Sequence, residues 1–171
     1  MTAADSDNSR SSTSSPSLGL SLAAGLGWLV VTFAAAAIGS QAGPGDWYAR
    51  LQKPSWNPPS WVFGPVWTYL YATMALAAWR IWRKGGWSQQ WGPLGLYCLQ
   101  LLFNAAWSLI FFGLKRPDLA FGEITVLWFL IGLTMGWFYQ IDRWSGLLFL
   151  PYFAWVSFAG FLNFTLWQLN R

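Results

Sequence analysis

Amide and aromatic side chains recur at helical spacing within the apolar stretches of this sequence. Gln100, Asn104 and Trp107 follow one another at i, i+4 and i+7, which places them on one face of a helix. Polar residues inside membrane-spanning helices are costly and usually face inward. The chemistry that these side chains offer is binding, because amides form hydrogen bonds and an indole ring presents a broad apolar face.

Two further apolar stretches repeat this spacing. The residues are Trp67, Tyr71 and Met74 in one stretch, and Trp155, Ala159 and Asn163 in the other. If the three faces converge, they enclose a cavity with aromatic walls and a few hydrogen-bonding groups, which suits a large, flat, mostly apolar ligand. The alternative is that the amides join helices and the rings fill the core. Such interhelical hydrogen bonds contribute about 0.6 kcal/mol each.

Several kinds of chemistry are excluded by composition. The chain has no histidine, the commonest metal ligand and usual general base, and one cysteine, Cys98. A His-based zinc site and a Ser-His-Asp triad are therefore ruled out, and we expect no metal site and no required cofactor. Glu123 is the only acid well inside an apolar stretch, and a proton relay there is a lesser alternative. The net charge of +4 is too small and scattered to indicate a nucleic-acid partner.

The elements that position these residues are expected to be membrane helices. The chain is 55% hydrophobic and 9% charged, whereas a soluble domain carries roughly 25% charged residues. Five apolar stretches are each close to the roughly 20 residues that a helix needs to cross a bilayer. They span residues 18–42, 61–82, 94–114, 119–139 and 146–169. This pattern predicts an all-α fold, an integral membrane bundle of five transmembrane helices formed by residues 17–171.

The ends of these stretches give further expectations. Residues 1–16 are polar and rich in serine, and we expect a disordered tail. Pro151 lies inside the fifth stretch and should kink it. The basic residues divide equally between the two sides of the membrane, so neither the orientation nor the particular membrane follows from the sequence.

A loop rich in proline and tryptophan leads into the second stretch, within residues 46–71. Pro58 and Pro59 remove two backbone donors in a row and disfavour a helix before them. We expect this stiff loop to cover one end of the bundle and to help form the ligand site. Arg50 and Lys53 flank its prolines, where they can pair with ligand carboxylates or with lipid phosphates.

Three segments resemble a known family, the translocator proteins or tryptophan-rich sensory proteins. They are WYARLQKPSWNPPSWVFGPVWTYLY (residues 47–71), PLGLYCLQLLFNAAWSLIFFG (93–113) and PYFAWVSFAGFLNFTLW (151–167). The resemblance covers everything after the polar tail. It implies five membrane helices, often as homodimers, with a ligand pocket beneath the first loop.

The resemblance also implies ligands and site residues. Members of the family bind porphyrins, and some bind cholesterol and benzodiazepine-type drugs. Carried over to this sequence, the pocket residues are Tyr48, Trp67, Tyr71, Gln100, Asn104, Trp107, Trp155 and Ala159. The cholesterol-recognition pattern of the fifth helix is absent, because Phe164 stands at its tyrosine position and no basic residue precedes Arg171. Such patterns are weak in any case.

Three functions are compatible with these features. The first is a membrane receptor or carrier for porphyrins, acting in tetrapyrrole handling and stress response and in contact with membrane lipid. The second, implied by the resemblance, is an enzyme that promotes light-dependent porphyrin degradation, for which Trp67 and Trp155 are the catalytic candidates. The third is a transporter of sterols, lipids or drugs. It ranks last because the spans lack the charged pairs usual in ion-coupled transport.

Overall fold

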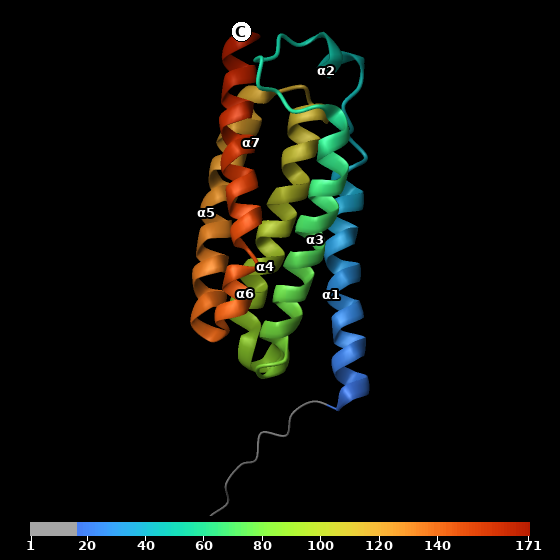
Figure 1. Cartoon of the computed structure of the whole chain (residues 1–171), viewed down its shortest axis with the longest axis vertical. Coiled ribbons are helices and arrows are strands. Elements are labelled where there is room, and N and C mark those ends of the chain that lie inside the picture. Colours follow the sequence, from blue (N-terminus) through green and yellow to red (C-terminus); the bar gives the residue numbers. More distant parts are fainter. Residues whose placement is uncertain (1–16) are drawn as a thin grey trace, which may run out of the picture.

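The computed structural model describes residues 17–171 and shows an elongated bundle of helices (Figure 1). The predicted disordered tail, residues 1–16, lies outside the described residues. The helices are α1 (Leu18–Gly39), α2 (Asp46–Arg50), α3 (Ser60–Trp82), α4 (Gly86–Ser108), the π-helical η1 (Leu109–Gly113), α5 (Pro117–Ile141), α6 (Arg143–Leu147) and α7 (Leu150–Leu169). No strand occurs in this part of the chain, so the predicted all-helical fold is confirmed.

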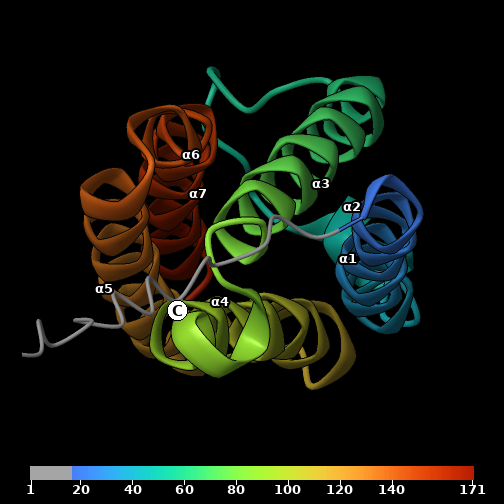
Figure 2. The same ribbon diagram turned by 90° about the horizontal axis from the view of Figure 1, so that it is seen from below.

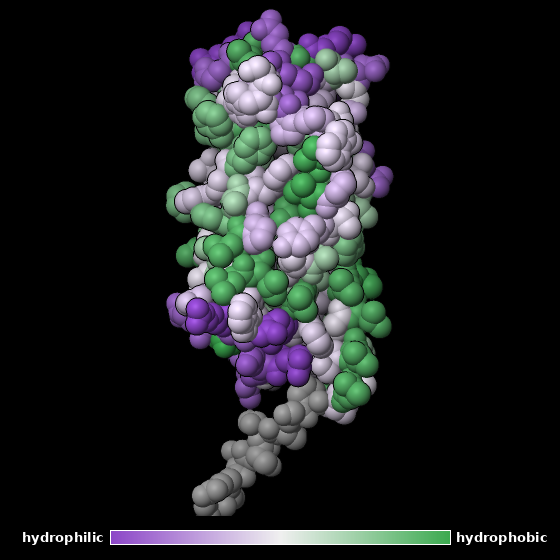
Figure 3. Space-filling model, viewed as in Figure 1, coloured by the Kyte–Doolittle hydropathy of each residue, from purple (hydrophilic) through white to green (hydrophobic). Residues whose placement is uncertain are grey.

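Four helical segments are long and apolar enough to cross a membrane. They are α1, α4 together with η1, α5, and the α6–α7 segment. Helix α3 has 23 residues but is not among them. Its tryptophan, tyrosine and threonine side chains lower its mean hydropathy. The surface agrees with a membrane protein, since hydrophilic side chains gather at the two ends and the band between them is apolar or weakly polar (Figure 3).

The long helices pack around a core that is densest in the half away from the loop. Seen along the bundle, α3 lies between α1 and the α5–α7 side, and α4 closes the opposite face (Figure 2). Ala77 and Ala78 of α3 are fully buried, and small residues let helix backbones approach closely. In the same region Tyr97 stacks on Phe138, and Phe149 meets both rings edge to face. This half is filled by side chains, which leaves the loop end as the place for a site.

Two prolines lie just after breaks in the helices. Helix α4 is interrupted at Gln90 (φ −113°, ψ 21°), and Pro93 lies in the first turn after the break. Pro151 lies in the first turn of α7, and Leu148 and Phe149 separate this helix from α6. The fifth stretch, for which a kink at Pro151 is predicted, is therefore interrupted just before this proline, at Leu148 and Phe149. A proline in the first turn leaves no hydrogen bond unmade, because that backbone N–H would have no partner inside the helix.

Candidate functional site

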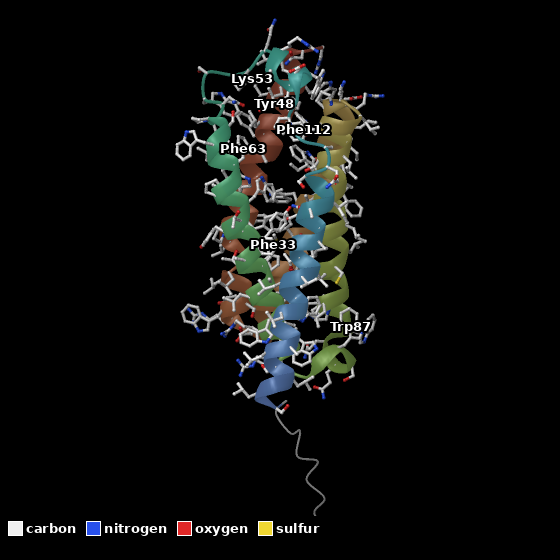
Figure 4. All side chains as sticks on the ribbon, turned by 90° about the vertical axis from the view of Figure 1, so that its right-hand side faces the viewer. Phe33, Tyr48, Lys53, Phe63, Trp87 and Phe112 are labelled. Atoms are coloured by element: carbon white, nitrogen blue, oxygen red, sulfur yellow. The ribbon has the colours of Figure 1, made fainter. Side chains whose placement is uncertain are left out.

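A cavity of about 1130 Å³ occupies the loop end of the bundle. Helices α1, α3, α4 and α7 form its walls, and the segment between α1 and α3 forms its roof. Phe33, Tyr48, Lys53, Phe63 and Phe112 lie around it (Figure 4). The cavity slightly exceeds the range of roughly 300–1,000 Å³ that is typical of ligand pockets.

The roof is held in place by Lys53 and Tyr48. The Lys53 ammonium donates to the carbonyl oxygens of Tyr48 (2.6 Å), Ala49 (3.1 Å) and Leu51 (3.2 Å), so it caps the C-terminal end of α2. The same ammonium lies 4.7 Å from the centre of the Tyr48 ring. The Tyr48 hydroxyl donates to Asn57 Oδ1 at 3.3 Å. Burial raises the pKa of Tyr48, against a smaller lowering by this bond.

The roof is also tied to α7, on the far side of the cavity from α1. The Trp56 ring stacks on Phe161 at a centroid distance of 5.3 Å. Asn170, just after α7, accepts from the Gln52 N–H at 2.9 Å and donates to the Gln52 carbonyl at 3.0 Å. The proline-rich segment therefore forms a fixed cover on this side.

Aromatic rings make up much of the cavity wall. Trp67 stacks on Tyr71 at 5.4 Å within α3. Phe63 and Trp155 meet edge to face at 5.8 Å and join α3 to α7. Trp107 of α4 stacks on Phe111 at 5.0 Å. Flat ring faces of this kind favour contact with an apolar, planar ligand.

A chain of hydrogen bonds forms the floor of the cavity. The Tyr71 hydroxyl donates to Asn104 Oδ1 at 2.6 Å, and Asn104 Nδ2 donates to the Tyr152 hydroxyl at 2.9 Å. The Tyr152 hydroxyl in turn donates to Gln100 Oε1 at 3.0 Å. Helices α3, α4 and α7 are joined by this chain. The end of this chain at Tyr71 and Asn104 lines the cavity, and it is the polar part that a ligand can reach.

The structure brings most of the predicted site residues together. Those that line the cavity are Tyr48, Trp67, Tyr71, Asn104, Trp107, Trp155 and Ala159. Gln100 does not line it, because it lies fully buried behind Tyr152. Asn163 joins helices, since it accepts from Trp107 Nε1 at 3.0 Å and donates to the Pro117 carbonyl at 2.7 Å.

Several residues of the site were not singled out by sequence reasoning. Tyr152 lies one turn before Trp155 on the same face of α7, so extending that stripe by three residues would have found it. Phe33 lines the cavity from α1 and meets the Tyr71 ring at 5.9 Å. The faces of α1 differ little in hydropathy, but its buried Ser21, Trp28 and Thr32 share one helical face and could have marked the side that turns inward.

The chain is similar to known proteins over most of its length. Residues 18–168 match the model of the TspO/MBR family. The chain is 43% identical over 145 residues to a tryptophan-rich sensory protein of Cereibacter sphaeroides, covering 85% of this chain and 90% of the relative. It is 38% identical over 161 residues to a translocator protein of Homo sapiens, and the match covers 91% of this chain and 90% of the relative. It is 39% identical over 146 residues to protein CrtK of Rhodobacter capsulatus, and the match covers 84% of this chain and 90% of the relative. With its apolar helices, the chain is thus an integral membrane protein that belongs to the TspO/MBR family.

Proposed function

We propose that this protein is a membrane receptor or carrier whose cavity binds a porphyrin, in the handling of tetrapyrroles and in stress response. The observation that carries the proposal is the large cavity walled by Trp67, Trp107 and Trp155, with a polar floor at Tyr71 and Asn104. A planar macrocycle offers a wide π-surface to these rings. The names of the relatives, sensory protein and translocator protein, support a receptor or carrier role.

The charged residues of the roof refine the proposal. Lys53 is engaged with three backbone carbonyls, so its first role is to hold α2. Arg50 is exposed at the end of α2 and is the better candidate to meet a ligand carboxylate at the edge of the cavity. The chain has no histidine to ligate iron, and we expect the metal-free ring to bind.

We also propose that α3 is a fifth transmembrane helix. Its length equals that of α4, and it lies within the bundle between α1 and the α5–α7 side (Figure 2). Two of its aromatic side chains, Trp67 and Tyr71, line the cavity inside the bundle. A homodimer, as the family resemblance implies, completes the proposed assembly.

Titration with metal-free protoporphyrin, followed through the porphyrin absorption band, tests the binding proposal. Ala159 lines the cavity, whereas Ala154 lies exposed on the same helix. Ala159→Phe should fill space that the ligand needs and weaken binding at least tenfold, which corresponds to about 1.4 kcal/mol. Ala154→Phe is the matched control and should bind as the unmodified protein does. Equal affinity in both variants would show that the porphyrin does not occupy this cavity.

Light-dependent degradation of the porphyrin is a second candidate function. It is favoured by the position of Trp67 and Trp155 on the cavity wall, with Trp67 stacked on Tyr71. A bound porphyrin that absorbs light would lie beside oxidisable rings. The measurement is the appearance of a new, protein-dependent product under illumination, and that product should be lost in Trp155→Phe. A product that forms equally in the variant would remove Trp155 from the reaction.

A further inference from the structure

The cavity is closed toward the roof on the α7 side but framed by small residues between α1 and α3. Four small residues line the cavity and are exposed at the same time: Ala37 of α1, Ser40 just after it, and Gly64 and Thr68 of α3. A side chain built on Gly64 would meet no atom within 4 Å. Figure 4 looks onto this side of the molecule, with Phe33 at the crossing of the two helices and Phe63 beside the opening.

The lower edge of this opening is set by Phe33 and Tyr71, whose rings meet at 5.9 Å. Above this pair, toward the loop, no hydrogen bond joins α1 to α3 among the described residues. The end of α1 instead approaches α4 closely, since a Cβ atom on Gly39 would lie 3.5 Å from Ala105 Cα. The two helices therefore separate above Phe33.

The two hydroxyl groups at the rim of the opening, those of Ser40 and Thr68, already donate hydrogen bonds to the backbone. Ser40 Oγ donates to the Ala37 carbonyl at 2.8 Å, and Thr68 Oγ1 donates to the Gly64 carbonyl at 2.9 Å. The outer faces beside it are apolar, with Val30 and Ile38 of α1 strongly exposed. Because α1 is a membrane-crossing helix by length and hydropathy, these exposed side chains face lipid.

We propose that the ligand of this cavity enters and leaves sideways, from the hydrocarbon region of the bilayer, through the opening framed by Ala37, Ser40, Gly64 and Thr68. This inference rests on the proposed binding function and on the membrane position of α3. The roof does not need to open in this route, which agrees with its anchoring by Asn170 and Trp56. The lateral route selects ligands that first partition into the membrane and that are thin enough to pass between α1 and α3.

The kinetics of metal-free protoporphyrin binding to protein in lipid nanodiscs test this route. Gly64→Leu narrows the opening, and we expect it to slow association and dissociation together by about fivefold or more while Kd stays unchanged. Gly122→Leu is the matched control, since Gly122 is exposed on α5 with no atom near its added side chain. Asn170→Ala releases the roof from α7 and should leave both rates as they are.

The outcomes separate the route from the function. Faster exchange in Asn170→Ala, with unchanged rates in Gly64→Leu, would overturn the lateral route in favour of passage beneath the roof. A higher Kd in Gly64→Leu caused by faster dissociation would also overturn it, because residue 64 would then be a ligand contact and not a gate. Both results leave porphyrin binding intact. A lack of saturable binding by the unmodified protein would overturn the proposed function together with the route.

Discussion

The side-chain amide of Asn170 pairs with the backbone of Gln52 through two hydrogen bonds, of 2.9 and 3.0 Å. The two residues are 118 positions apart, and the pair joins the C-terminal end of α7 to the roof of the cavity. The roof is therefore held by the last turn of the bundle and not only by its own prolines.

Removal of this pair should loosen the roof without unfolding the bundle. Asn170→Ala loses the two exposed hydrogen bonds with Gln52 and the bond that Asn170 donates to the Leu166 carbonyl at 2.8 Å. We expect a loss of about 1–2 kcal/mol in unfolding free energy. Tryptic cleavage after Arg50, measured by mass spectrometry on the protein in detergent, should become faster. Gln168→Ala is the control, because Gln168 lies two residues before Asn170 and its side chain forms no hydrogen bond among the described residues. This variant should be cleaved at the original rate. Equal cleavage in both variants would mean that the roof does not depend on Asn170.

Asn104 is expected to be the most sensitive polar residue of the cavity floor. Asn104→Ala removes the acceptor of the Tyr71 hydroxyl and the donor to the Tyr152 hydroxyl, inside the bundle. Buried polar groups left without partners cost about 1–3 kcal/mol. Thermal unfolding in detergent should show a lower Tm, whereas Leu102→Ala, which truncates a side chain exposed on the same helix, should have little effect.

A double-mutant cycle isolates the contribution of the Tyr71–Asn104 bond. In Tyr71→Phe the hydroxyl is absent, so adding Asn104→Ala should cost less than it does in the unmodified protein. Strictly additive losses of stability would show that the two residues do not interact in the folded state.

The stability of the end away from the cavity should depend on pH through Asp142. Arg80 donates to this carboxylate from Nε (2.8 Å) and Nη2 (3.0 Å), and the Ser145 N–H and hydroxyl donate as well. The Arg80 guanidinium, aided by Ser145, lowers the pKa of Asp142 to about 2. An aspartate in an unfolded chain has a pKa of about 3.9. The stabilisation of the folded state by ionised Asp142 is therefore present above about pH 4 and is lost as the pH falls toward 2.

Asp142→Asn tests this dependence. The variant should unfold at a lower temperature than the unmodified protein at pH 7, and the difference should narrow between about pH 4 and pH 2. Asp46→Asn is the control, because Asp46 is exposed and forms no ion pair among the described residues. A difference in Tm that stays constant down to pH 2 would show that the charge of Asp142 is not what stabilises the fold.

Gly146 is expected to tolerate no side chain. A Cβ atom at this position would lie 2.6 Å from Tyr139 Cα and 2.8 Å from the Tyr139 nitrogen, both backbone atoms of α5. Gly146→Ala should force α6 away from α5 and destabilise the protein by about 1–3 kcal/mol. Gly136→Ala on α5 meets no atom within 4 Å and should keep or slightly raise the Tm. Similar melting curves for the two variants would contradict this close approach.

The sequence determined the helical, membrane-embedded character of the chain and most of the residues around the cavity. Lipid forces the backbone to satisfy its own hydrogen bonds, so the apolar stretches had to be helices. Helical spacing then placed Asn104 and Trp107 on one face, and Trp155 and Ala159 on another. The prolines excluded a helix just before α3, and a non-helical segment lies there, covering the cavity.

The tertiary structure decided which of these residues reach the cavity. Spacing cannot fix the depth or the rotation of one helix relative to its neighbours, and for that reason it could not separate Gln100, buried behind Tyr152, from Asn104, which lines the wall. The faces of α1 differ little in hydropathy, so its packing on α3 and α4 decided that Phe33 lines the cavity. The bond between Asn170 and Gln52 depends on two segments that meet only when the bundle is complete.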